Sequence, residues 1–513
     1  MNTKPQYLHL ACRLATVALF LRTGFAADYE QNLDKSFSVT SGGKLDIQAD
    51  RGSIEVATDG SEKAEVRVFR KVKGGSKAQA DELLNNHEVT LAQDGNTVSV
   101  VARNRKERSG FWSLGRANLD VRYQVSIPRK FDVELKTAGG NIQVDDLDGQ
   151  ASAHTTSGSI NLQSVTGNVK AVDAGGNISV AEAGGSLTAH TTSGSISLGK
   201  VKGKVEALNA GGNIRITQTG NDVSVRTTSG SITLGVVNGN LEASNAGGDI
   251  KADSVSGDVE AQTTSGSIHL GVVKGKRVKV KDAGGTIEIG EATGSVAAET
   301  TSGSIAIQAA RGDVEAKDAG GNISIGIAGA KVTAQTSSGS IRIKAVNGNL
   351  QARNAGGDVS IEEAARDCEI RTTSGSIVLG LAKGKVEARN SGGDIKVGEA
   401  RDVVAAETSS GTIRVRFAGQ PKDGCRLEVA GGGINVDLPQ SAALDLDAKT
   451  SGGRVIADLP VTVTVEGDHH PGALHGKING GGPALILRAS SGDIHLGTFA
   501  APKMAAEDET PGK

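Results

Sequence analysis

Clustered carboxylates are the first residues of this chain that could do chemistry. Glu362 and Glu363 are adjacent, and Asp367 follows shortly after. Two acids held at a fixed distance in a cleft can act as general acid and base, as in polysaccharide hydrolysis. The position after each repeated isoleucine, described below, carries no further acidic cluster. A solvated face is therefore favoured over a polysaccharide-active enzyme, and we expect no enzyme.

Histidines could hold a metal ion at two places. His469, His470 and His475 lie close together in a loop with proline and glycine, and imidazole is a common zinc ligand. His154 and His190 occupy equivalent positions of an 18-residue repeat, described below, in which each repeat forms one coil. They lie two coils apart, which is too far to share one ion. An exposed loop is the favoured interpretation for the first group, with a weak metal site as the alternative. We expect no cofactor.

Two features of the repeat resemble ligand-binding patterns. Gly-Gly-Asn and Gly-Gly-Asp phrases invite comparison with calcium-binding nonapeptides, but the acid is often replaced, and calcium needs six or more oxygen ligands. Thr-Thr pairs suggest ice- or mineral-binding surfaces, but they recur only in every second coil, roughly 9.6 Å apart. Structural corners are the favoured interpretation of both patterns.

Two basic segments could contact a partner. The first marks a one-residue insertion in the repeat and contains Lys274, Lys276, Arg277, Lys279 and Lys281. The second combines cations with two aromatic rings, which suits an anionic envelope surface, a glycan or a protein partner. Its candidate contact residues are Arg103, Arg105, Lys106, Arg108, Phe111, Trp112 and Arg116. The alternative is that the two rings fold back on their own domain.

A repeated sequence phrase indicates the fold that positions these residues. TTSGSI or a close variant recurs with a spacing of 36, with AGGNI-like phrases midway, so the underlying period is 18. A constant period with glycine at each turn is typical of stacked repeats. Within a coil, apolar residues alternate and fall 0, 2, 5, 9 and 11 residues after each isoleucine. Such alternation predicts short strands with one face inward.

The predicted fold class is all-β, a parallel β-helix (solenoid) of about 18 residues per coil with an N-terminal β-rich capping domain. We expect a right-handed coil from the crossover rule. No proline lies between Pro128 and Pro421, as expected of a long hydrogen-bonded ladder. Thirteen residues after each isoleucine, threonine alternates with asparagine or aspartate. Such stacked side chains can bond along the rod axis and satisfy buried corner groups.

The N-terminus predicts export. Lys4 and Arg13 precede the apolar run 14–21, and a small-residue site follows at 24–26, so residues 1–27 read as a signal peptide. No later stretch is long and apolar enough to span a membrane. Of 56 basic residues three lie in this segment, leaving 53 against 58 acidic ones and a net charge of −5. That balance gives no case for nucleic acid.

Two cysteines remain beyond that segment, Cys368 and Cys425. Their repeat positions place them three coils apart, roughly 14 Å, which is too far for a disulfide. We therefore expect two buried thiols that act as small hydrophobic residues.

The predicted organisation has five parts: a signal peptide at 1–27, the capping domain at 28–136, regular coils at 137–416, irregular coils with a C-terminal cap at 417–500, and a disordered tail at 501–513. The capping domain is expected to hold alternating strands, a turn at 94–96, and a short helix in which Ser76 and Gln79 have capping-box spacing.

Particular motifs resemble a known family. They begin with a Phe-x-Val…Gly-Gly-x-Leu-x-Ile motif at 37–47, followed by Gly-Ser-Ile at 52–54 and the segments 94–100 and 125–128. The repeated Ser-Gly-x-Ile phrases follow, and the closing motif is INGGGPALILRASSGDI at 478–494. Together they resemble the bacterial adhesin family of β-strand-repeat proteins, a domain family of unknown function, over nearly the whole mature chain. The resemblance implies an exported β-solenoid without established catalytic residues.

The sequence leaves three functions to compare. The first is a non-enzymatic cell-envelope rod that acts as an adhesin or a structural binding protein, located in the periplasm, on the cell surface or outside the cell. The second is an envelope-stress or signalling accessory that docks a partner through its N-terminal domain. The third, a polysaccharide-active enzyme, lacks the acidic cluster it would need.

Overall fold

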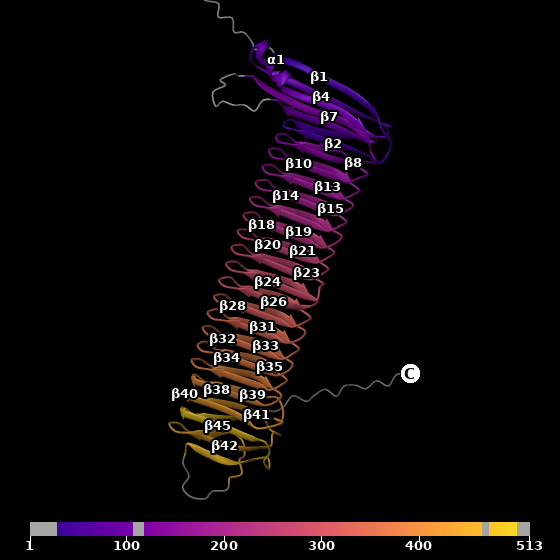
Figure 1. The fold of residues 1–513 in the computed structure, drawn as a ribbon. Helices are drawn as coiled ribbons and strands as arrows, with labels where there is room; N and C mark the ends of the chain where they lie inside the picture. Colours follow the sequence, from indigo (N-terminus) through magenta and orange to yellow (C-terminus); the bar gives the residue numbers. More distant parts are fainter. Residues whose placement is uncertain (1–27, 106–116, 464–470, 500–513) are drawn as a thin grey trace, which may run out of the picture.

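The computed structural model describes residues 28–105, 117–463 and 471–499. They form a long rod of stacked coils, with about 17 turns of about 18 residues (Figure 1). Each regular coil contributes one strand to each of two parallel sheets, called sheet A and sheet B here. The predicted β-solenoid is confirmed, whereas its handedness and the bounds of the five predicted segments stay predictions.

Sheet A contains the strand that begins at the repeated isoleucine. Its regular strands are β9 (Ile142–Val144), β11 (Ile160–Val165), β13 (Ile178–Ala183), β15 (Ile196–Val201), β17 (Ile214–Thr219), β19 (Ile232–Val237), β21 (Ile250–Val255), β23 (Ile268–Val273), β25 (Ile287–Ala292), β27 (Ile305–Ala310), β29 (Ile323–Ala328), β31 (Ile341–Val346), β33 (Val359–Ala364), β35 (Ile377–Ala382), β37 (Ile395–Ala400) and β39 (Ile413–Phe417).

Sheet B contains the second strand of each coil. Its regular strands are β8 (Phe131–Thr137), β10 (Ala151–Thr155), β12 (Val169–Asp173), β14 (Leu187–Thr191), β16 (Val205–Asn209), β18 (Val223–Thr227), β20 (Leu241–Asn245), β22 (Val259–Thr263), β24 (Arg277–Asp282), β26 (Ser295–Thr300), β28 (Val314–Asp318), β30 (Val332–Thr336), β32 (Leu350–Asn354), β34 (Cys368–Thr372), β36 (Val386–Asn390), β38 (Val404–Ser410) and β40 (Cys425–Gly431).

The core follows the predicted periodicity. In the coil that starts at Ile160, the buried side chains are Ile160, Leu162, Val165, Val169 and Ala171, at the five inward positions. Equivalent residues stack directly on one another, since Ile160 pairs with Ile178 and Val169 pairs with Leu187. One continuous hydrophobic core therefore runs from Phe37 to Leu496.

The N-terminal strands join the same sheets in an order that differs from the sequence. They are β1 (Tyr29–Ser38), β2 (Gly43–Ala49), β3 (Ser53–Asp59), β4 (Lys63–Lys73), β5 (His87–Asp94), β6 (Thr97–Asn104) and β7 (Asn118–Pro128). The β2–β3 coil lies between the β6–β7 coil and the β8–β9 coil. Antiparallel strands then end each sheet, with β4 and β1 in sheet A and β5 in sheet B.

Helix α1 (Lys77–Asn86) lies at this end of the rod, near β1 and β4 (Figure 1). Its predicted capping box is confirmed: the Ser76 hydroxyl accepts from the Gln79 backbone N–H, and the Gln79 side chain accepts from the Ser76 backbone N–H. The predicted turn at 94–96 joins β5 to β6.

The C-terminal end repeats this arrangement. Its strands are β41 (Ile434–Pro439), β42 (Leu444–Thr450), β43 (Val455–Ala457), β44 (Ala473–Ile478), β45 (Ala484–Ser491) and β46 (Ile494–Phe499). The last coil in sequence, β45–β46, is inserted between β40–β41 and β42–β43. At both ends, therefore, the first or last coil of the chain is held from two sides.

The corner glycines are not all needed for their backbone angles. Gly375 and Gly411 have positive φ, of 123° and 132°, whereas Gly176 and Gly194 do not have left-handed backbone angles. A Cβ at Gly176 would lie 1.5 Å from the carbonyl oxygen of Gly158 in the preceding coil. Glycine is required because consecutive backbones approach closely at this corner.

Candidate binding groove

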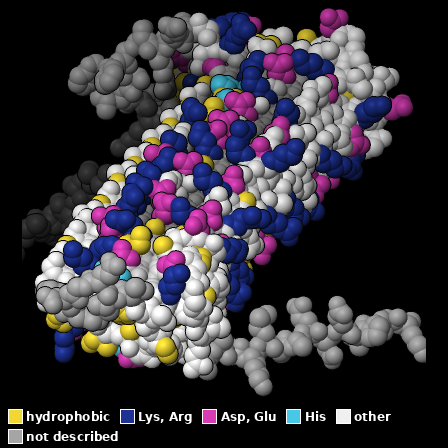
Figure 2. Space-filling model, turned by 90° about the horizontal axis from the view of Figure 1, so that it is seen from below, with side chains coloured by type: hydrophobic (Ala, Val, Ile, Leu, Met, Phe, Trp, Pro, Cys, Tyr) yellow, Lys and Arg dark blue, Asp and Glu magenta, His cyan; other side chains and the backbone are white. Residues whose placement is uncertain are grey.

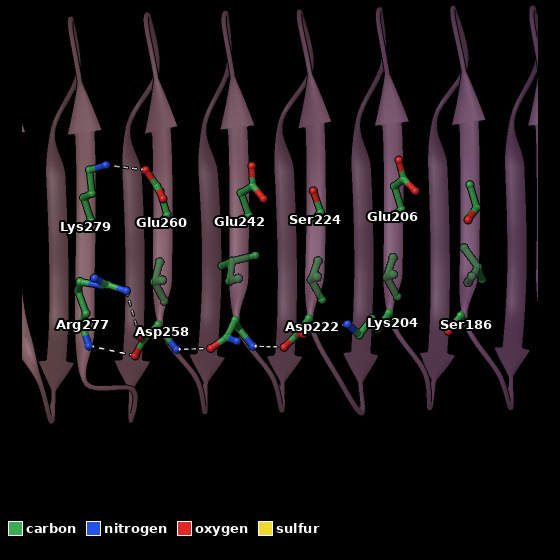
Figure 3. Close-up of a pocket in the computed structure, with 17 residues that line it drawn as sticks. Ser186, Lys204, Glu206, Asp222, Ser224, Glu242, Asp258, Glu260, Arg277 and Lys279 are labelled. Atoms are coloured by element: carbon green, nitrogen blue, oxygen red, sulfur yellow. Dashed lines mark hydrogen bonds and ion pairs between the residues drawn. The ribbon is translucent and has the colours of Figure 1, made fainter.

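A ladder of polar side chains crosses six neighbouring coils on the outer face of sheet B. The register of β14 to β24 aligns one outward position of each strand, and this row consists of Thr188, Glu206, Ser224, Glu242, Glu260 and Lys279. These side chains lie in a straight line along the rod (Figure 3). With neighbouring strands about 4.8 Å apart, the row spans roughly 24 Å.

The ladder lines a shallow open groove of about 820 Å³. The residues just before the strands form its second row, among them Lys204, Asp222 and Asp258, and Arg277, the first residue of β24, continues it. The inward residues of the same strands, such as Val205 and Val223, are fixed in the core. The groove is therefore a rigid surface, since each outward side chain stands on a strand paired on both sides.

Most charges in this groove are already paired. Lys279 Nζ lies 2.7 Å from Glu260 Oε1, and this bond holds the pKa of Glu260 below its usual value. Arg277 lies 3.7 Å from Asp258, and Lys204 lies 3.6 Å from Asp222.

Two carboxylates of the ladder lack a close ion-pair partner among the described residues. Glu206 has only a distant contact, 3.8 Å from His190, and Glu242 has no ion pair among the residues that the structure places. With Ser224 between them, they offer hydroxyl and carboxylate groups to a ligand. Such a row suits an extended polar chain that can donate hydrogen bonds at several points.

The acid pair Glu242 and Glu260 needs comparison with a hydrolase site. They are neighbours in the ladder, and two carboxyl groups about 5 Å apart could serve a retaining glycosidase. However, Glu260 is held by Lys279, whose hydrogen bond lowers its pKa, so Glu260 does not suit the role of general acid at neutral pH. The groove is also open, so it does not exclude water. The geometry favours binding over catalysis.

Sequence reasoning missed this ladder. It considered the outward residue after each isoleucine, which lies in sheet A, and not the outward position of sheet B. Steps of 18 from Thr188 reach Glu206, Ser224, Glu242 and Glu260, and a step of 19 across the insertion reaches Lys279, so the period could have revealed the row.

The insertion at residues 274–281 lies at one end of the groove, which Arg277 and Lys279 line. The extra residue lengthens β24, and the backbone N–H groups of both Lys276 and Arg277 donate to Asp258 Oδ1, at 2.8 and 3.1 Å. Lys281 pairs with Glu299 at 2.8 Å. The predicted basic segment is therefore largely neutralised by neighbouring acids. Figure 2 shows the same mixture of acidic and basic side chains along the flank.

The acidic group considered in the sequence, Glu362, Glu363 and Asp367, makes contacts within the rod itself. Glu363 pairs with Lys383 at 2.6 Å, and Asp367 Oδ1 accepts from the backbone N–H of Lys385 at 3.0 Å. This agrees with the solvated face that the sequence favoured.

The histidines are spread over separate surfaces. His154 and His190 lie on β10 and β14, with β12 between them. His475 Nδ1 lies 2.8 Å from Asp447 Oδ1, while His469 and His470 fall outside the described residues. Within the described ranges, no group of three or more His, Cys, Asp or Glu side chains could hold a metal ion.

The repeated Asn, Asp and Thr side chains stabilise the corners. Asn177 Oδ1 accepts from the backbone N–H of Ser195 in the next coil at 2.8 Å. The Thr191 hydroxyl donates to the carbonyl of Gly176 at 2.9 Å. The buried side chains thus bond to the backbone of the preceding coil, and not to one another as the ladder pattern suggested. The favoured structural interpretation of both phrases is confirmed.

The basic and aromatic loop is only partly described. Arg103 and Arg105 lie where the chain leaves β6, and Arg105 makes two hydrogen bonds of 3.0 Å to Glu88. The remaining predicted contact residues lie outside the described part of the chain: Lys106, Arg108, Phe111, Trp112 and Arg116. The partner role of this loop stays a prediction.

Family comparison agrees with the coil architecture. The profile of Toastrack DUF4097 matches residues 43–308, 213–348 and 308–497, which together span most of the chain. The chain belongs to the Toastrack family. None of the curated protein sequences matches this Toastrack chain.

Several solved structures are similar. One, from Clostridium sporogenes, is described as a "putative cell adhesion protein", with 11% identity, a TM-score of 0.16, and coverage of 47% of this chain and 99% of that one. A "putative adhesin" from Parabacteroides merdae has 13% identity, a TM-score of 0.17 and coverage of 70% and 95%.

A "Putative lipid binding protein" from Parabacteroides distasonis has 12% identity, a TM-score of 0.16 and coverage of 69% and 97%. At these scores the likenesses do not indicate what this Toastrack chain binds. In the described part of the chain, no helix has the length and hydrophobicity needed to cross a membrane.

Proposed function

We propose that this chain is a non-enzymatic, exported cell-envelope rod of the adhesin type that binds an extended glycan along the groove of sheet B. The observation that carries the proposal is the straight ladder from Thr188 to Lys279, in which Glu206, Ser224 and Glu242 keep free bonding capacity. A glycan presents hydroxyl donors at regular intervals, so it can bond to several rungs at once.

Binding of the purified mature protein to a glycan panel and to isolated envelope fractions tests this function. The informative variants are Glu242→Gln and Ser224→Ala. A matched control is Glu315→Gln, which removes a carboxylate from the same face of sheet B outside the groove. We expect saturable binding that both groove variants weaken by about tenfold, as for the loss of one or two hydrogen bonds.

Two results would contradict the groove proposal. Equal binding by the groove variants and the control would place the contact elsewhere on the rod. No binding to any glycan or envelope fraction would indicate a passive structural rod. Release of shortened glycans that Glu242→Gln abolishes would instead favour an enzyme.

Docking through the N-terminal end is a second candidate function. The observation that favours it is position: α1 lies at the tip of the rod (Figure 1), and the backbone N–H of Arg105 donates to Asn86 at the end of that helix, so a partner can approach there without contacting the coils. Changing Phe111 and Trp112 to alanine distinguishes the two functions. Loss of envelope binding in that variant, with groove variants unaffected, supports docking through the loop.

A further inference from the structure

Five polar side chains meet inside the N-terminal end of the rod, away from the groove. Asp50 and Arg51 form the corner between β2 and β3, Arg70 lies on β4, His87 begins β5, and Tyr123 lies on β7. His87 is 1% exposed, Arg70 is 6% exposed and Tyr123 is fully buried. So many buried polar groups in a small region need a physical explanation.

Several of these groups lack hydrogen-bond partners among the described residues. They are both ring nitrogens of His87, the Tyr123 hydroxyl, the Nε atoms of Arg51 and Arg70, and Asp50 Oδ1. His87 Nε2 lies 3.4 Å from Asp50 Oδ1, while Asp50 Oδ2 accepts from the backbone N–H of Asn104 at 3.0 Å. The cluster contains two fixed cations and only one carboxylate.

Arg70 links this cluster to the helix. Its Nη1 donates to the carbonyl oxygens of Leu84 and His87, at 3.1 and 2.8 Å, and its Nη2 donates to Gln31 Oε1 at 2.6 Å. The guanidinium therefore fastens the last turn of α1 and strand β1 to β4. Hydrogen bonds from a buried cation to carbonyls are among the stronger ones in proteins.

Helix α1 has few other contacts. Ala80 is its one buried residue, and Leu83 and Leu84 are only partly buried against the core. The backbone N–H of Arg105 donates to the carbonyl oxygen of Asn86 at the end of the helix, at 2.8 Å. A ten-residue helix is marginal without more packing. Its docked position therefore depends largely on the hydrogen bonds of Arg70.

Burial lowers the pKa of His87, and the nearby Arg70 and Arg51 lower it further, whereas Asp50 opposes them. The charged groups that act on the His87 ring are thus Asp50 and Arg51 from the corner and Arg70 from β4. Burial also raises the pKa of Tyr123, so its hydroxyl keeps its proton. His87 is therefore uncharged in the docked state near neutral pH.

We propose that this cluster is an acid-sensitive latch: protonation of His87 adds a third cation beside Arg51 and Arg70, and so releases α1 and the start of β5 from the end coil. The stacked coils have no such cluster in the described residues and stay folded. The rod thereby changes the surface at its N-terminal tip in response to acid, without changing its length.

The direction of this pH effect on docking follows from proton linkage. An exposed histidine has a pKa of about 6.5, above that of the docked His87, so the released state binds more protons once the pH falls below about 6.5. Docking then weakens by up to about tenfold per pH unit, until the pKa of the docked state is reached. Above about pH 7 the latch is closed and insensitive to pH.

Hydrogen exchange of the mature protein tests the latch. Between about pH 7.5 and 5, with intrinsic rates corrected, protection of residues 77–94 should fall below about pH 6.5, by up to about tenfold per pH unit, while coils such as β19 and β20 keep theirs. His87→Gln should abolish this dependence, because glutamine does not titrate. His269→Gln is the matched control, since it removes a half-exposed histidine paired with Glu288 on the rod.

Unchanged protection in the wild type, or an equal acid response in His87→Gln, would overturn the latch. If His87→Gln leaves residues 77–94 unprotected at neutral pH, NMR titration of the wild-type histidines decides instead. A His87 midpoint below about 6.5 that coincides with loss of protection supports the proposal, and a midpoint at or above that value contradicts it.

Discussion

The side-chain amide of Asn209 donates a hydrogen bond to the carbonyl oxygen of Gly194 in the preceding coil, at 2.7 Å. The Asn209 carbonyl oxygen meanwhile accepts from the backbone N–H groups of Gly211 and Gly212, at 3.1 and 3.2 Å. One buried side chain thus satisfies the corner of its own coil and the corner of the coil before it. In the alternate coils a threonine hydroxyl bonds to the coil before it, as Thr191 donates to the carbonyl oxygen of Gly176.

Asp173 occupies the same position but lacks the donor. Its Oδ1 accepts from the Gly175 N–H at 3.0 Å, while its buried Oδ2 has no hydrogen-bond partner. We expect Asp173→Asn to raise stability by about 1 kcal/mol, because the new amide can donate to Gly158 as Asn209 does to Gly194. The midpoint of urea unfolding measures this.

Asp282→Asn is the control for that substitution. Both carboxylate oxygens of Asp282 already accept from backbone N–H groups at 3.0 Å, so neither oxygen is left without a partner as Asp173 Oδ2 is. We expect a smaller gain for this variant. An equal rise in both variants would show that the effect comes from lost charge and not from the new hydrogen bond.

The close approach of neighbouring backbones at the corners leads to a second prediction. Gly176→Ala should destabilise the rod by more than about 2 kcal/mol, since its Cβ would collide with the Gly158 carbonyl and the stacked backbone cannot move aside. Gly139→Ala provides the comparison, because no atom lies within 4 Å of the added Cβ. Thermal unfolding of both variants measures the difference, and similar melting temperatures would refute the steric argument.

The two thiols yield a third prediction. Cys368 and Cys425 are free and buried, on strands separated by β36 and β38, as their spacing predicted. Burial raises the pKa of Cys368 to about 12, and it raises the pKa of Cys425 as well. Because the thiolate is the reactive form, we expect almost no reaction with a thiol reagent at about pH 8 until denaturant is added. Rapid labelling of the native protein would contradict this.

The regular coils were predictable because one residue, the repeated isoleucine, sets the register of every strand. Ile160 and Val169 are buried at the positions that the period of 18 assigns to them. The ends were not predictable, because the β2–β3 coil sits between two coils that follow it in the chain, and no local pattern shows such an order. The His87 cluster was missed for the same reason, since its members come from four separate strands and corners.

Coil pairing leads to the last prediction. Deleting residues 305–340 removes β27 to β30 and joins Ser304 directly to Ile341, which restores the original phrase Ser-Gly-Ser-Ile. β25 can then pair with β31, because both strands place isoleucine at the same inward positions. We expect a folded rod shorter by about 9.6 Å, with both ends unchanged, measurable by small-angle scattering or electron microscopy.

Deleting 305–339 instead leaves one extra residue at the junction, which turns every following side chain to the opposite face unless the corner absorbs it. That variant should lose stability, and equal folding of the two would show that the corners, and not the inward ladder, set the register.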